Sequence, residues 1–184
     1  SDGLTVAEAV TRRSGVVGEK MELDGYNVLE GDNISVYDHM RRHTLATMVQ
    51  LSAANDEAGY KVAMQVAAMK PVALDEASVP QSVKDEELRI AIEKTKEEQI
   101  ERQVNVALKK AGINANLVDS DDHIASNVAK GWLTQEDADK AVAIRKEVSE
   151  TAAANLKEQM IQNIAKGRMA KFFKESCLVD QEFQ

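Results

Sequence analysis

Two histidines are the first residues whose type and spacing could do chemistry. His39 and His43 stand four residues apart, a spacing that on a helix can present two ligands to a zinc ion. Here Arg41 and Arg42 separate them, in what we predict to be a turn between strands. Because neighbouring positive charges disfavour a bound cation, we expect no metal site at these histidines.

Two other patterns resemble ligand sites without meeting their requirements. The acidic cluster at residues 119–122 suggests a calcium loop, but the Gly and the distal Glu that such a loop needs are missing at their offsets. Acids at this position fit the first turn of a helix instead, where the helix dipole favours anions. Gly15 and Gly18 before Lys20 lack the spacing and the Ser or Thr of a phosphate loop. We therefore expect no cofactor.

The remaining reactive groups give little material for catalysis. The chain has three histidines, and no arrangement of Ser, His and acid rises above chance. The single cysteine, Cys177, excludes an internal disulfide and a Cys/His metal pattern, and we interpret it as a small buried hydrophobic residue. These observations favour a binding protein over an enzyme and predict no catalytic residue.

Composition and charge narrow the class further. The 184 residues are 43% hydrophobic but only 4% aromatic, which favours thin helical packing around a real core. The net charge of -8 argues against direct binding of nucleic acid, because phosphate contacts need a broad basic surface. No apolar run reaches the roughly 18 residues of a membrane span, and residues 1–10 lack the pattern of a signal peptide. We expect a cytoplasmic chain without a membrane partner.

The first 80 residues predict a small α+β unit. Residues 5–15 indicate a short helix capped by Thr5 and ending at Gly15. Between residues 20 and 52, three runs with period-2 alternation predict a three-stranded antiparallel sheet. Residues 56–69 return to helical spacing and should cover one face of that sheet.

The second part of the chain predicts a long helical hairpin. Residues 83–111 keep apolar positions at steps of three or four, and a second long helix opens at Thr134. We expect the two helices to run antiparallel, with a short helix capped by Ser120 at the tip and Trp132 sealing that tip. Residues 1–80 and 155–184 would then form a core subdomain, with residues 81–154 as an inserted hairpin.

A basic, aromatic segment near the end of the chain, "IAKGRMAKFFKES", interrupts the acidic composition. On a helix its apolar residues form a slanting stripe while its lysines and arginine occupy the remaining surface. We interpret it as a core helix with a cationic outer face, preceded at Asn155 by a break that also provides the N-cap of the new helix.

Three segments, in this order, resemble the core of bacterial elongation factor Ts, the guanine nucleotide exchange factor of elongation factor Tu. Residues 18–39 look like the family's strand pair that ends in Tyr-x-His, here Tyr37 and His39. Residues 67–71 are similar to a helix that closes on Ala-Ala-x-Lys-Pro, and residues 167–172 match a Gly-Arg-Met-x-Lys-Phe helix. The resemblance covers roughly residues 16–80 and 155–184, with the family's coiled-coil insertion between them.

The resemblance implies a partner and a docking edge. The partner would be elongation factor Tu, in its GDP-bound or nucleotide-free form, and release of GDP would follow from binding alone. By motif position, the candidate partner-binding residues are Tyr37, His39, Arg42, Lys70 and Pro71.

The sequence also departs from the family. Met40 and Gln65 stand where the family often has Gly and another His, so no contact is carried over to them. The family's N-terminal ubiquitin-associated-like module and its Thr-Asp-Phe-Val motif are not found in residues 1–184. We therefore expect an internal fragment of a longer factor. The alternatives are a scaffold whose hairpin self-associates into a homodimer and an RNA-binding translation accessory, the latter disfavoured by the net charge.

Overall fold

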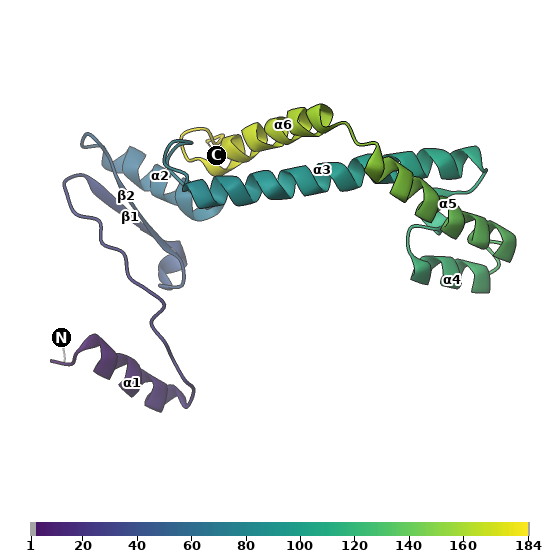
Figure 1. Ribbon diagram of the computed structural model, residues 1–184. Coiled ribbons are helices and arrows are strands. Elements are labelled where there is room, and N and C mark those ends of the chain that lie inside the picture. Colours follow the sequence, from purple (N-terminus) through teal and green to yellow (C-terminus); the bar gives the residue numbers. More distant parts are fainter. Residues whose placement is uncertain (1–2, 184) are drawn as a thin grey trace. The chain divides into compact units, whose positions relative to one another are not determined.

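The computed structural model describes residues 3–183 and has the expected α+β class. The chain divides between Met69 and Lys70 into two compact units, and each is described by itself (Figure 1). The grouping of residues 1–80 with residues 155–184 stays a prediction.

The first unit begins with helix α1 (Val6–Val17). A capping box starts it: the Glu8 amide donates to the Thr5 hydroxyl, and the Thr5 amide donates to the Glu8 carboxylate at 2.7 Å. The hydrogen bonds that the Thr5 amide and hydroxyl donate to this carboxylate lower the pKa of Glu8. The helix ends at Gly18, with φ 79°, rather than at Gly15, because a left-handed residue is what closes the last turn.

The sheet has two strands, so the prediction of three is wrong. Strand β1 (Ile34–Asp38) pairs antiparallel with β2 (Ala46–Gln50), and Val36 lies opposite Met48. The segment 20–30 was predicted as the third strand but contains none. Its apolar side chains are exposed (Met21, Leu23, Tyr26 and Val28), and no described residue supplies the backbone partners that a strand needs.

Helix α2 (Asp56–Met69) covers one face of this sheet, as predicted. The Thr47 hydroxyl donates to the Ala63 carbonyl at 2.7 Å, which ties β2 to the helix. Gly59 is buried where α2 meets Ser35 of β1, and a Cβ at Gly59 would stand 2.0 Å from the Ser35 hydroxyl oxygen. The absence of a side chain at Gly59 therefore sets how closely the helix approaches the sheet.

The second unit is a set of helices around one long helix (Figure 1). Helix α3 (Gln81–Lys110) leads into the short 3₁₀ helix η2 (Ala115–Leu117) and then into helix α4 (Asp121–Ala129). Helices α5 (Gln135–Ala154) and α6 (Glu158–Ser176) return along α3, to which both pack. The predicted caps Ser120 and Thr134 both accept backbone amides. Asn155 ends α5 and does not start α6.

Two groups of buried residues hold this unit together. At the distal end, α3, α4 and α5 enclose an apolar core whose most buried members are Leu108, Val118 and Ala141. At the other end, α6 packs against α3 through buried residues that include Thr95, Ile161 and Ala165. The small residues let the helices approach closely, as the low aromatic content predicts.

The segment before α3 is joined to the segment after α6 by a short ladder. Ala73 and Cys177 form a parallel bridge, and the Leu178 amide donates to the Ala73 carbonyl at 3.0 Å. Cys177 is fully buried, as the sequence predicts, and burial raises the pKa of its thiol.

Trp132 is placed differently from the prediction. Its side chain is 65% exposed, with the Lys130 ammonium 5.0 Å from its ring centroid, and the neighbouring Leu133 is buried in its place. Of the described helices, none combines the length and the apolar character that a membrane crossing demands.

Candidate docking site

The end of β1 and the turn that joins it to β2 carry three of the five predicted partner-binding residues. It contains the 3₁₀ segment η1 (His39–Arg41), and Met40, Arg41 and His43 have φ values of 55°, 55° and 57°. Left-handed backbone is uncommon for residues with a Cβ and costs on the order of 1 kcal/mol each. A turn with three such residues is held in shape by its surroundings.

Tyr37, near the end of β1, and His39, at the start of the turn, are brought together. The Tyr37 hydroxyl is hydrogen-bonded to His39 Nδ1 at 2.8 Å, and the ring of Tyr37 stands edge-on to Tyr60 of α2 at 5.6 Å. Tyr37 is half-buried and His39 is exposed. Helix α2 thus fixes the tyrosine ring, and the tyrosine in turn orients the imidazole toward solvent.

Asp38 fastens the other side of the turn. Its carboxylate accepts a hydrogen bond from the His43 amide at 3.0 Å and lies 2.5 Å from His43 Nδ1. His39 and His43 are therefore engaged with different residues and do not face one ligand. Among the described residues, no group of His, Cys, Asp and Glu side chains could hold a metal ion.

Arg42 completes the turn. Its side chain is exposed. Its backbone amide donates to the His39 carbonyl at 3.3 Å, which holds the Arg42 backbone next to that of His39. The surface formed by Tyr37, His39 and Arg42 is here named the β1–β2 turn. It offers an imidazole and a guanidinium on a fixed backbone. Such a surface can bind a partner without paying the entropy of ordering a loop.

The other two predicted residues belong to the second unit. Lys70 is exposed and has φ 46°, directly after α2 ends. Pro71 is half-buried and precedes Val72, whose amide donates to the Ser176 carbonyl at 2.8 Å. The residues Lys70 and Pro71 are therefore set beside the end of α6. A shared docking edge with the β1–β2 turn stays a prediction.

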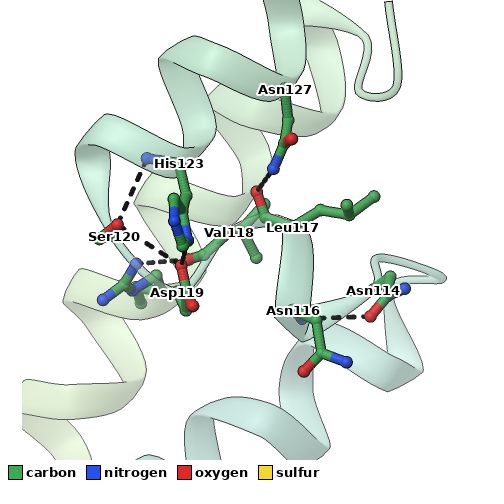
Figure 2. A network of polar contacts seen from close by, with 9 residues as sticks. Asn114, Asn116, Leu117, Val118, Asp119, Ser120, His123 and Asn127 are labelled. Atoms are coloured by element: carbon green, nitrogen blue, oxygen red, sulfur yellow. Dashed lines mark hydrogen bonds and ion pairs between the residues drawn. The ribbon is translucent and has the colours of Figure 1, made fainter. Parts of the chain in front are cut away.

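The hairpin tip holds a polar network that sequence reasoning missed (Figure 2). The buried Asn127 donates from its side-chain Nδ2 to the Leu117 backbone carbonyl at 2.9 Å. The backbone carbonyl of Asn127 accepts hydrogen bonds from the Trp132 and Leu133 amides. At the start of α4, His123 Nδ1 lies 2.5 Å from Asp119, and this hydrogen bond lowers the pKa of that carboxyl. No spacing signal could have found Asn127, because its partners are ten residues before it and five after it.

Fold and turn together define a class: an α+β protein that joins a small sheet with a fixed turn to a long helical hairpin. The family model described as "Elongation factor TS" matches residues 1–119 and 99–184. The chain belongs to the elongation factor Ts family.

Curated relatives agree with this assignment. The chain is similar to elongation factor Ts of Bacteroides fragilis, with 59% identity over 179 residues, and to that of Phocaeicola vulgatus, with 57% identity over 178 residues. In both cases the match spans 97% of this chain and 54% of the relative. A more distant match, elongation factor Ts of Flavobacterium psychrophilum, is 28% identical over 99% of this chain and 47% of the relative. The chain thus spans about half the length of these relatives. No solved structure matches it.

Proposed function

We propose that this chain binds elongation factor Tu and promotes the release of GDP as part of a translation elongation factor. The observation that carries the proposal is the match of the Elongation factor TS model across residues 1–119 and 99–184. Because the chain spans about half of its relatives, the full activity is proposed for the longer factor to which such a chain corresponds. Translation elongation takes place in the cytoplasm, where we expect this chain to act.

In this proposal the partner contacts the β1–β2 turn of the first unit and, as a separate contact, Lys70 and Pro71 of the second. The turn supports it by its geometry: Tyr37 is held by Tyr60, and His39 is oriented by the hydroxyl of Tyr37. Arg42 adds an exposed guanidinium. Arginine is enriched among the residues that contribute most of the binding energy at protein interfaces.

Exchange in this scheme needs no covalent step. A protein that binds the nucleotide-free state of its partner more tightly than the GDP-bound state shifts the population toward the former, by an amount equal to the difference in the two binding free energies. By reciprocity, GDP weakens the complex by the same factor. The chain would therefore act as an exchange factor through binding, without catalytic residues.

Titration against elongation factor Tu loaded with fluorescent GDP tests the proposal. We expect the chain to bind nucleotide-free elongation factor Tu. We expect it to promote GDP release from that factor only slowly, since the Thr-Asp-Phe-Val motif is not found in residues 1–184. A failure to bind the nucleotide-free factor would remove the proposed function from this region. Release as fast as that by a full-length elongation factor Ts would contradict the expected slow exchange.

A pair of variants locates the docking surface. Arg42→Ala removes an exposed cation from the turn, and we expect binding to weaken by about tenfold, the effect of an interface hot spot. Lys61→Ala is the matched control, because Lys61 is an exposed cation of the same unit that belongs to α2 and forms a 2.6 Å ion pair with Glu57. Equal effects of the two variants would argue against the turn.

No observation favours the scaffold or the RNA-binding alternative, so a single function is proposed. Light scattering during size-exclusion chromatography measures the molar mass of the chain in solution. The scaffold alternative requires a dimer whose population grows with protein concentration.

A further inference from the structure

The distal half of the hairpin contains a cavity of about 520 Å³ between α3, η2 and α5. Its floor is apolar and includes Ile100, Val104 and Leu108, of which the last two are buried. Its edge on α3 carries Glu97 and Glu101. An apolar floor beneath carboxylates suits a ligand that has an aliphatic body and a cationic end.

Glu97 and Glu101 are neighbouring acids on α3. They stand one helical turn apart, where two like charges repel and destabilise a helix. Glu93 pairs with Arg89, and Glu98 pairs with Arg168 of α6. Within residues 3–183, by contrast, neither the Glu97 nor the Glu101 carboxylate forms an ion pair or accepts a hydrogen bond. Two exposed, unpaired carboxylates thus face the same cavity.

The other charged groups of the lining leave this negative potential in place. Asp119 is engaged with His123 at 2.5 Å. Arg145 of α5 is the cation of the lining, and its Nη1 donates to the Val118 carbonyl. That carbonyl is neutral, so Arg145 keeps its charge, and three carboxylates of the lining (Glu97, Glu101 and Asp119) stand against one guanidinium. A cleft that carries an excess of one sign concentrates ions of the opposite sign.

We propose that this cavity, the α3–α5 pocket, receives an arginine side chain of a partner protein. The three-carbon stem of arginine would lie on the apolar floor, and its planar guanidinium, with five donors, could bridge the two carboxylates. The compact, strongly hydrated ammonium of lysine offers neither the planar fork nor the weaker hydration that favours interface pairs. Arginine is also enriched at protein interfaces, where lysine is depleted.

This inference goes beyond the proposed function and does not depend on it. The pocket lies wholly in the second unit, whereas the β1–β2 turn lies in the first. Loss of binding to elongation factor Tu would leave the pocket hypothesis standing, and an empty pocket would leave the exchange hypothesis standing.

The test uses the full chain, labelled with ¹⁵N and titrated with N-acetyl-arginine methylamide. We expect saturable shifts of the backbone amides of Ala115, Asn116 and Val118, which line the pocket. The neutral citrulline analogue should produce none, and the lysine analogue should bind more weakly. The titration should extend to about 100 mM, above the roughly millimolar dissociation constant that ligand efficiency allows for a molecule of this size.

Two double variants with equal change in net charge locate the site. Glu97→Gln with Glu101→Gln should weaken binding by at least about tenfold, because both charge-assisted hydrogen bonds are lost. Glu147→Gln with Glu150→Gln, two exposed acids of α5 outside the lining, should leave the affinity unchanged. Unchanged thermal unfolding of both variants confirms that the fold is intact, since no side chain involved makes a packing contact that holds the core.

Four results would overturn the proposal. They are the absence of saturable shifts, equal binding of the lysine analogue, equal weakening by the two double variants, and shifts spread over all the acidic helices without preference for the pocket. The first denies a site, the second denies the choice of arginine, and the last two describe general attraction to an acidic protein.

Discussion

At the residue scale, Gly59 decides how closely α2 approaches the sheet. Gly59→Ala would place a methyl group 2.0 Å from the Ser35 hydroxyl oxygen and 2.8 Å from its Cβ. Rotation of the hydroxyl relieves the first contact but not the second. We expect the variant to lower the free energy of unfolding of the first unit by about 1–3 kcal/mol, as overpacked sites do.

Gly167 is the matched control for this prediction. It is also a helical glycine, but nothing lies within 4 Å of the Cβ that an alanine would add there. Gly167→Ala should raise stability by about 0.5–1 kcal/mol, because alanine reduces the backbone entropy of the unfolded chain. Urea unfolding followed by circular dichroism measures both variants, and a stabilising Gly59→Ala would contradict the close approach.

Cys177 is a second residue whose behaviour follows from its surroundings. Burial is the main reason that the pKa of its thiol is raised, and the nearby acids Asp180, Asp75 and Glu76 raise it further. Little thiolate exists at neutral pH, and the sulfur has no access to solvent. We expect a thiol reagent to react with the native chain at least about tenfold more slowly than with the chain in denaturant. Fast reaction of the native chain would show that the ladder between residues 72–74 and 176–179 opens readily.

The same thiol makes stability depend on pH in a definite direction. Since the folded-state pKa lies above the unfolded value of about 8.5, the folded state holds its proton more tightly. The contribution is fully present below that unfolded pKa and is lost as the pH rises through the folded pKa. Cys177→Ala should remove this part of the pH dependence in thermal unfolding between neutral and alkaline pH.

At the scale of elements, the hairpin depends on its distal core. Leu108 is 1% exposed, and Leu108→Ala should cost about 2–5 kcal/mol by the loss of buried surface and the cavity left behind. Val106, two residues earlier on α3, is 50% exposed, so Val106→Ala should change stability by less than about 0.5 kcal/mol. Chemical denaturation distinguishes the two, and similar costs would show that the hairpin is not organised around this core.

The strands show where local pattern failed. Alternation in segment 20–30 predicts a strand as well as the alternation in β2 does, and β2 does alternate between exposed and half-buried residues. A strand also needs hydrogen-bonding partners at its edge, and pattern does not report whether any exist. Predicting a helix from its pattern is safer, because the backbone hydrogen bonds of a helix lie within the segment itself. The bounds of α2 and the caps at Thr5, Ser120 and Thr134 were therefore predictable.

At the scale of the whole molecule, the two units differ in how much they bury. Among residues 3–69, the buried side chains are the small or polar ones of α2, whereas the second unit buries Leu108, Ile161 and Val118. We expect a fragment of residues 70–184 to keep its helices and to unfold cooperatively. A fragment of residues 1–69 should show little cooperative structure, because so small a core cannot offset chain entropy. Circular dichroism melts of both fragments check this, and a fully unfolded 70–184 fragment would contradict it.

The sequence by itself determined the α+β class, the places of α2 and of the long helices, and the family resemblance through three ordered motifs. These follow from signals within a few residues: periodicity, caps, and the Tyr37-x-His39 spacing. Only the tertiary structure decided that Trp132 is exposed while Leu133 is buried, that Asn127 closes the hairpin tip, and that Glu97 and Glu101 face one cavity without an ion pair. Each of these depends on residues distant in sequence, and the burial and electrostatics of a side chain are properties of the neighbours that folding supplies.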